Sequence, residues 1–490
     1  MKSAFALLAG LAGSAALFYF GTGLAPVAAL TWLAPLPVLL LAPRVRQASA
    51  LGVAFGAYLL GTSNSWGFHV HSHDEPMLPV GLVIILGMSL TFMLVVWLFR
   101  ALVVRGRTLL AAVAAPAAWT GVLYIVSVTN PMGLVGTRAN DQGDVALVLQ
   151  TAAIGGMWMV EFLVIFVPCA VAGLAAPGVP RGARLRTATV AVVVVVAALG
   201  FGALRLAGTG GAPQRVAAIA PNQYSWAPPV SEALVAGYVR EIESLPTGVR
   251  TAVLPEGALA VEGAAPASLI EPMRQAAQAR DIDIVLGFVQ TEGHAHDNIA
   301  LVFPADGGNP VRYLKQHDLV NPHGHDLVFA PGTRTGIEIC ADLDFSQPSR
   351  DYGTAGTTLL AVPASDNNEN GWQHSRTGLL RGVENGMPVA WSGQNGSLMI
   401  ADGWGRVLAQ AHTGGPAAFT TIVADVAGPG PTSYSRLGDW FAWLCLTIAL
   451  GGLIAALPIS AKLGRARDHR RVVRSAAEGG EGAGRSAKPR

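Results

Sequence analysis

Apolar and polar positions are distributed very unevenly along this chain of 490 residues. The first 209 residues are a succession of apolar blocks joined by short polar segments, and one further apolar block lies near residue 450. A helix needs about 20 apolar residues to cross the roughly 30 Å hydrocarbon core of a bilayer. The pattern therefore predicts about eight transmembrane helices, near residues 3–23, 26–42, 48–66, 79–99, 108–128, 147–176, 187–206 and 438–458.

Residues 210–430 have a different pattern, in which short apolar runs alternate with amphipathic stretches. The runs at 215–220, 251–254, 282–288 and 299–303 predict buried strands. The stretches 230–244 and 266–280 have helical spacing, with Leu234, Val235, Val239 and Ile242 on one face of the first. Strands that alternate with helices predict an α/β domain whose sheets are covered by helices.

Basic residues follow every second predicted helix, which predicts the orientation in the membrane. They are Arg44 and Arg46 after the second helix, Arg100, Arg105 and Arg107 after the fourth, and Arg181, Arg184 and Arg186 after the sixth. Because Lys and Arg accumulate in cytoplasmic loops, we expect both termini in the cytoplasm. Seven helices precede the α/β domain, so the domain is predicted to be extracytoplasmic.

The predicted organisation has four parts. A transmembrane bundle occupies residues 1–209, and an extracytoplasmic α/β domain occupies residues 210–430. A C-terminal transmembrane helix at 437–459 and a basic, disordered cytoplasmic tail at 460–490 complete the chain. Composition agrees with a multi-pass membrane protein, since 51% of the residues are hydrophobic and only 13% are charged. The net charge of +2 gives no reason to expect nucleic-acid binding.

Three residues in the α/β domain indicate chemistry. Glu256 and Cys340 each follow a predicted strand, and Cys340 is the one cysteine of this domain. Lys315 is the one lysine between residues 3 and 461, in a chain that otherwise uses arginine. A lysine ammonium is a compact charge that can sit beside an oxyanion, so its retention here indicates a specific role.

Together these residues predict covalent catalysis by a thiolate. A cysteine must lose its proton before it attacks, and a carboxylate such as Glu256 can accept that proton. Lys315 then stabilises the oxyanion, and the backbone N–H of Ala341 is expected to add a second donor. Read singly, a glutamate after a strand is usually a solvated loop residue, and a lone cysteine is usually a small buried apolar residue.

The triad resembles that of the nitrilase superfamily, whose catalytic residues are Glu, Lys and Cys in this chain order. With the predicted membrane helices, the sequence resembles the apolipoprotein N-acyltransferase family over nearly the whole chain. Further similar segments lie at 155–162, 221–226, 297–300, 365–367, 373–374, 381–388, 395–397 and 402–405. The resemblance implies a membrane bundle joined to a nitrilase-like sandwich.

Two segments depart from the family pattern. The family has a glutamate shortly after the lysine that supports the active site, and His325 or Asp326 stands at that place here. The family follows its cysteine with tyrosine and glutamate, where this chain has Ala341 and Asp342. By the resemblance, these four residues are expected to support the triad.

The resemblance implies an acyltransferase of the cell membrane. The acyl donor would be a phospholipid, the intermediate a thioester on Cys340, and the acceptor the N-terminal amine of a diacylglyceryl-modified lipoprotein. No cofactor and no metal are expected. The residues alone indicate only acyl transfer through a thioester, so two alternatives stay open: a membrane-anchored nitrilase-type amidohydrolase, and a divergent homologue without catalytic activity.

Overall fold

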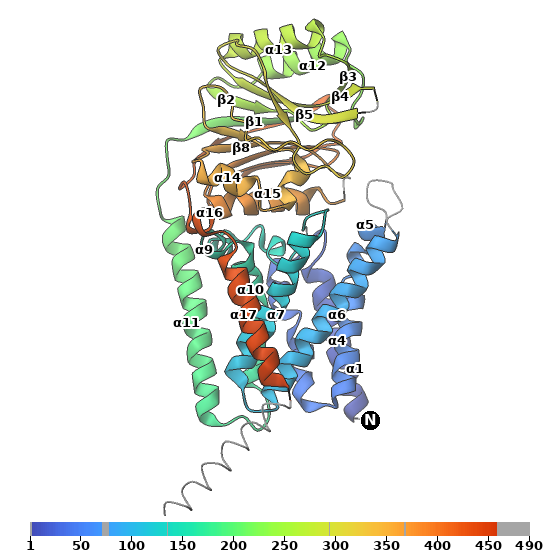
Figure 1. Ribbon diagram of the computed structural model, residues 1–490, viewed down its shortest axis with the longest axis vertical. Helices are drawn as coiled ribbons and strands as arrows, with labels where there is room; N and C mark the ends of the chain where they lie inside the picture. The colour runs from blue at the N-terminus through green and yellow to red at the C-terminus, as the bar shows by residue number, and fades with distance from the viewer. Residues whose placement is uncertain (1, 71–77, 135, 294, 367–368, 458–490) are drawn as a thin grey trace, which may run out of the picture.

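The computed structural model describes residues 2–70, 78–134, 136–293, 295–366 and 369–457. A helical bundle forms one half of the molecule, and a domain of two stacked sheets forms the other (Figure 1). The predicted C-terminal tail, 460–490, lies outside the described residues.

The bundle is formed by the N-terminal helices and by one helix from the end of the chain. Its helices are α1 (Lys2–Gly21), α2 (Ala28–Leu33), α3 (Leu36–Leu41), α4 (Gln47–Gly61), α5 (Trp66–Val70), α6 (Leu78–Val103), α7 (Thr108–Thr129), α8 (Ala146–Leu149), α9 (Ala152–Gly155), α10 (Met157–Leu174), α11 (Arg181–Leu206) and α17 (Trp440–Ala456). Among the described residues, five helices are long and apolar enough to cross a membrane, namely α1, α6, α7, α10 and α11.

The other three predicted spans are shorter or interrupted helices. The second is divided into α2 and α3, because Pro35 has no N–H to continue the helix that ends at Leu33. The third, α4, has 15 residues and is about 22 Å long. The eighth, α17, has 17 residues. The predicted number of eight spans therefore stays a prediction.

The sixth predicted span, 147–176, was wrong in its first part. Gly156 has a φ of +70°, and a Cβ there would lie 2.5 Å from the Tyr434 ring. The chain therefore turns at this glycine, which separates α8 and α9 from α10. The long apolar helix begins only at Met157.

The α/β domain consists of two sheets packed face to face. One has seven strands: β1 (Gln214–Pro221), β2 (Val249–Val253), β3 (Leu259–Glu262), β4 (Asp283–Glu292), β5 (Ala295–Phe303), β6 (Val311–Leu314) and β12 (Phe419–Val426). The other has five: β7 (Thr335–Ile337), β8 (Leu359–Ser365), β9 (Val389–Gln394), β10 (Ser397–Ala401) and β11 (Val407–His412). The strand orders are β12-β1-β2-β4-β5-β6, with β3 beside β4, and β11-β10-β9-β8-β7.

Helices cover both outer faces of these sheets. Helices α12 (Glu232–Glu243) and α13 (Ala267–Arg280) lie on the side away from the bundle, while α14 (Ser349–Thr354) and α15 (Gly371–Asn385) lie between the sheets and the bundle (Figure 1). The predicted α/β character, the four strands and the two helices are thus confirmed, with bounds that differ by a few residues. Val235 and Ile242 on α12 are buried, as the helical spacing predicts.

Buried polar contacts join α15 to the bundle and to the segment that carries Cys340. Glu384 accepts a hydrogen bond from the Met157 backbone N–H at 2.6 Å and pairs with Arg381 at 2.7 Å. The Arg381 guanidinium also donates to the Leu343 carbonyl at 2.9 Å. The start of α10 and the turn η5 (Cys340–Asp344) are therefore fixed relative to each other.

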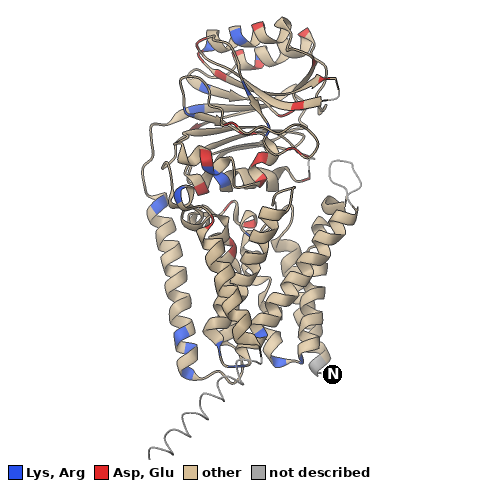
Figure 2. Ribbon diagram, viewed as in Figure 1, with Lys and Arg blue, Asp and Glu red and all other residues tan. Residues whose placement is uncertain are grey.

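The basic loops of the bundle gather at its end far from the sheets (Figure 2). Arg44 donates to the Ala175 carbonyl at 2.5 Å, and Arg107 donates to the Ala455 carbonyl at 3.0 Å. Three separate loops and the end of α17 thus lie together at this end. The α/β domain lies at the opposite end (Figure 1).

Candidate active site

Glu256 lies just beyond the end of β2 and is 3% exposed. Its Oε1 accepts a hydrogen bond from the Asn298 amide at 2.7 Å and one from the Lys315 ammonium at 2.7 Å. The Gln394 amide donates to the Glu256 backbone carbonyl at 2.5 Å. Two side chains of the seven-stranded sheet therefore hold the carboxylate, and one side chain of the five-stranded sheet holds the backbone of the same residue.

Lys315 directly follows β6 and is also buried. Its backbone N–H donates to the Asn298 carbonyl at 2.9 Å, which continues the pairing of β6 with β5. Burial by itself lowers the pKa of Lys315, but the Glu256 carboxylate and other nearby acidic groups outweigh it and hold the pKa above its usual value. Lys315 is therefore an ammonium ion at neutral pH.

Cys340 begins η5 after β7 and has a φ of +48°. This left-handed conformation is uncommon for a residue with a side chain, and such strain is concentrated at functional sites. Burial raises the pKa of the Cys340 thiol to about 11, and the Glu256 carboxylate adds to this rise. At neutral pH the sulfur is therefore protonated, so it needs a base before it can act as a nucleophile.

Asp342 connects the segment after Lys315 to the segment around Cys340. Its carboxylate accepts hydrogen bonds from the Tyr313 hydroxyl at 2.7 Å and from the backbone N–H groups of Gln316, His317 and Ile339 at 3.0, 2.7 and 2.9 Å. Burial raises the pKa of Asp342 to about 6, although the charge of Lys315 opposes the rise. Ala341, between Cys340 and Asp342, lines the same cavity as the triad.

His325 and Asp326 lie on the surface, outside the cavity that contains the triad. The Gly324 N–H donates to the Lys315 carbonyl at 2.8 Å, so the chain folds back before it reaches His325. The structure does not bring these two residues to Cys340, in contrast to the expectation from the family pattern.

A histidine lies close to Cys340 instead. The Nδ1 atom of His374, on α15, is 3.9 Å from the Cys340 sulfur and 3.0 Å from an Asp366 carboxylate oxygen. Its Nε2 atom is 3.4 Å from a carboxylate oxygen of Asp344. The sequence assigned no role to His374, Asp366 or Asn298, although all three lie in segments that resemble the family.

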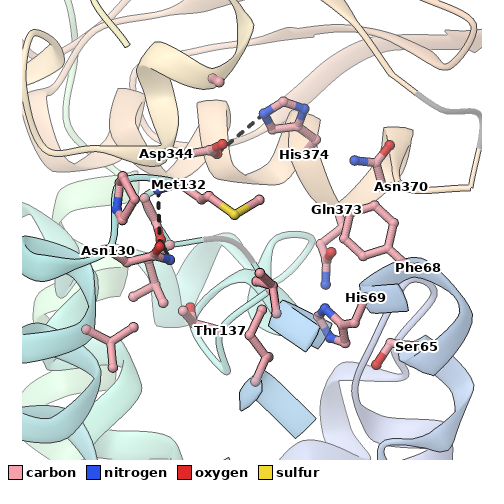
Figure 3. A pocket seen from close by; sticks show the side chains of 18 of the residues that line it. Ser65, Phe68, His69, Asn130, Met132, Thr137, Asp344, Asn370, Gln373 and His374 are labelled. Carbon is pink, nitrogen blue, oxygen red and sulfur yellow. Dashed lines mark hydrogen bonds and ion pairs between the residues drawn. The ribbon is translucent and has the colours of Figure 1, made fainter. Parts of the chain in front are cut away.

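A single cavity of about 1230 Å³ contains the triad and continues into the bundle. Figure 3 shows Asp344 and His374 on the domain side of this cavity, with Ser65, Phe68 and His69 on the bundle side. The walls contributed by α6 and α7 are largely apolar and include Val80, Val83, Ile84, Ile85, Met88, Val122, Leu123 and Val126. The Cys340 thiol and an apolar space between helices therefore share one cavity.

The described residues contain no group of three or more His, Cys, Asp or Glu side chains arranged to hold a metal ion. The chemistry that this site offers is proton transfer at Glu256, positive charge at Lys315 and nucleophilic attack by Cys340.

Known proteins match the two halves of the chain. The sequence model of the apolipoprotein N-acyltransferase N-terminal domain matches residues 14–170, and that of carbon-nitrogen hydrolases matches residues 215–428. An apolipoprotein N-acyltransferase of Gloeobacter violaceus is 26% identical, over 89% of this chain and 91% of the relative. One of Geobacter metallireducens is 31% identical, over 26% of this chain and 25% of the relative. An (R)-stereoselective amidase of a Pseudomonas species is 28% identical, over 32% of this chain and 68% of the amidase.

Proposed function

We propose that this chain, which is similar to apolipoprotein N-acyltransferases over most of its length, is an acyltransferase that catalyses their type of reaction. It transfers a fatty acyl group from a phospholipid to the N-terminal amine of a diacylglyceryl-modified lipoprotein. Cys340 carries the acyl group between the two substrates as a thioester. Glu256 accepts and returns the proton, and Lys315 stabilises the negative charge that develops on the carbonyl oxygen.

One observation carries this proposal: the thiol and the apolar space between α6 and α7 belong to the same cavity. A small polar amide as substrate would need only the polar part of this cavity, around the thiol. A phospholipid needs both, because its ester must reach the sulfur while its acyl chain remains among apolar side chains. The cavity volume of about 1230 Å³ is ample for such a chain.

In the first half-reaction, Glu256 accepts the proton of the Cys340 thiol and the thiolate attacks the ester carbonyl carbon. The carbonyl oxygen becomes an oxyanion, which the Lys315 ammonium and the Ala341 N–H stabilise. Collapse breaks the ester C–O bond and leaves the acyl group on the sulfur. The departing lysophospholipid oxygen takes the proton from Glu256.

In the second half-reaction, the free amine of the lipoprotein attacks the thioester carbonyl. Glu256 accepts a proton from the attacking amine, and the same two donors stabilise the second oxyanion. The C–S bond breaks, an amide forms, and the Cys340 thiolate recovers its proton from Glu256. The enzyme returns to its starting protonation state without a cofactor.

We further propose that the chain is a multi-pass protein of the cell membrane with its α/β domain outside the cytoplasm. The gathering of basic loops at the end of the bundle far from the sheets supports this orientation (Figure 2). Cysteine accessibility tests it. An impermeant thiol reagent added to intact cells should label a cysteine introduced at Arg250, which is exposed on the α/β domain, and should not label one introduced at Arg107.

Acyl transfer is tested with the detergent-purified chain and a phospholipid that carries a labelled acyl chain. We expect an acyl adduct on Cys340, its discharge to a diacylglyceryl-cysteine peptide with a free amine, and no discharge to the N-acetylated peptide. The Cys340→Ala variant should form no adduct, and Cys169→Ala serves as its matched control.

Two other results would favour the two alternative functions, a hydrolase and a homologue without catalytic activity. Release of free fatty acid at the same rate with and without the amine would indicate a hydrolase, consistent with the likeness of this domain to an amidase. No adduct on Cys340, together with full complementation of a lipoprotein-acylation defect by Cys340→Ala, would indicate a homologue without catalytic activity.

A further inference from the structure

His374 is packed against acidic and sulfur-bearing side chains from several elements. Asp344 and Cys340 approach it from η5, and Asp366 approaches it from the end of β8. The Trp391 ring on β9 contacts the imidazole edge to face, with 4.7 Å between the ring centres. The side chains of His374, Asp344 and Asp366 are each at most 8% exposed, so water does little to screen these charges.

The two ring nitrogens of His374 face carboxylates on opposite sides. A neutral imidazole has one N–H and one lone pair, so one nitrogen would direct its lone pair at a carboxylate oxygen. That arrangement is repulsive, whereas a protonated ring with two N–H groups can donate one to each of the two carboxylates. Burial by itself lowers the pKa of His374, but the Asp344 charge and its other neighbours outweigh it and place the pKa well above the ordinary value.

We infer that His374 is a further catalytic residue, an imidazolium held by Asp344 and Asp366 that stabilises the Cys340 thiolate. The inference deepens the proposed function, on which it rests for the role of Cys340 as nucleophile. Lys315 does not meet this need alone, because in the proposed mechanism its ammonium, which lies 2.7 Å from Glu256, stabilises the oxyanion on the substrate carbonyl. His374 supplies the second positive charge, 3.9 Å from the sulfur.

The imidazolium keeps its protons throughout the reaction. In acylation the thiol proton moves to Glu256, and the negative charge left on sulfur faces the His374 cation. In deacylation the C–S bond breaks and the electron pair returns to sulfur, where the same cation makes the thiolate a better leaving group. His374 therefore assists both half-reactions without acting as the base.

Reactivity of Cys340 towards iodoacetamide measures this effect without any acyl substrate. The full-length chain with Cys169→Ala and Cys445→Ala retains Cys340 as its one thiol, because the sequence has three cysteines. Alkylation rates of this protein and of its His374→Asn derivative are measured by mass spectrometry at about pH 7, 8 and 9. Asparagine can still donate a hydrogen bond to Asp366 but carries no charge.

The size of the expected effect follows from the distance. A unit charge 3.9 Å from the sulfur, at an effective dielectric constant of about 20, corresponds to about three pKa units. The more basic thiolate is also more nucleophilic, which offsets nearly half of the loss. We therefore expect His374→Asn to slow alkylation about 30-fold at each pH. His412→Asn, at an exposed histidine on β11, is the matched control and should react like the parent.

A fall of tenfold or more in folded His374→Asn protein supports the inference, and a smaller fall overturns it. A histidine that only anchors α15 would leave the rate and its pH profile unchanged. If His374→Asn does not fold, Asp344→Asn takes its place, and a fall of less than threefold in that variant overturns the inference. Since the probe needs no lipid, this result is independent of whether acyl transfer to lipoproteins is found.

Discussion

The buried pair of Glu256 and Lys315 allows a prediction about both stability and activity. The two side chains are 4% and 10% exposed, and their charged atoms are 2.7 Å apart. Lys315→Met keeps most of the side-chain volume and removes the charge. Glu256 would then be a buried carboxylate hydrogen-bonded to Asn298 but without its counter-ion. Breaking a buried ion pair in this way costs about 3–5 kcal/mol, which we expect as a clear fall in melting temperature.

The same substitution removes one of the two proposed oxyanion donors. Loss of one donor typically slows the chemical step by about 10²–10³. We expect at least this loss in the single-turnover acylation of Cys340 by a labelled phospholipid, measured by intact mass. The Glu256→Gln, Lys315→Met double variant removes both charges, so its melting temperature should recover in part while its activity remains lost.

An exposed ion pair serves as the control for this experiment. Arg250 and Asp281 also form an ion pair, but their side chains are 62% and 73% exposed. Arg250→Met should leave the melting temperature and the acylation rate unchanged, because exposed pairs contribute little. The reasoning would be refuted if Lys315→Met kept the parental melting temperature, or acylated Cys340 within threefold of the parental rate.

Three further predictions concern pH, the junction of the two halves and the cavity. Acidification through about pH 6 should slow acylation, because protonation of Asp342 weakens the acceptor that fixes the segment after Lys315. Acidification should not lower the melting temperature through this group, because a folded-state pKa above the ordinary value of an aspartate means that protonation favours the folded state. Asp342→Asn should lack the inflection in the rate–pH profile. Glu384→Gln should destabilise the protein by about 3–5 kcal/mol, because it leaves the buried Arg381 unpaired, whereas melting of Glu271→Gln, at an exposed pair, should match the parent. Val126→Trp should narrow the apolar part of the cavity, so acylation by long-chain phospholipids should slow more than acylation by short-chain ones, with iodoacetamide labelling of Cys340 unchanged.

Much of the architecture could be predicted because it depends on local patterns. The strand ends before Glu256 and Cys340 are marked by apolar runs, and strand ends of a sandwich meet at a common edge, where these residues line one cavity with Lys315. The apolar character of a segment was less informative about where a helix begins and ends, because a single residue can interrupt the helix. Pro35 and Gly156 are both visible in the sequence, yet the apolar character around them hid the breaks they impose.

The surroundings of Cys340 were less predictable because they depend on packing between distant elements. His374 lies within a helix, with no strand end or spacing to mark it, and its distance from Cys340 follows from how Arg381 ties α15 to η5. The expectation for His325 and Asp326 relied on counting along the chain from Lys315. The bond from Gly324 to the Lys315 carbonyl turns the segment outwards, which no count could reveal.

Hydrogen bonds attach the α/β domain to the bundle at several points; the Gln373 amide, for example, donates to the Gly23 carbonyl at 3.0 Å. The connections from α11 and to α17 run next to each other, where the Gly211 N–H bonds to the Gly428 carbonyl at 3.2 Å, and Glu384 holds the start of α10. A domain fastened in this way does not lift off to admit a substrate from the water. For the proposed enzyme, donor molecules then arrive by diffusion within the plane of the bilayer. The rate would follow the mole fraction of phospholipid in the membrane or micelle, and an inert amphiphile added at constant phospholipid would slow it by dilution in two dimensions.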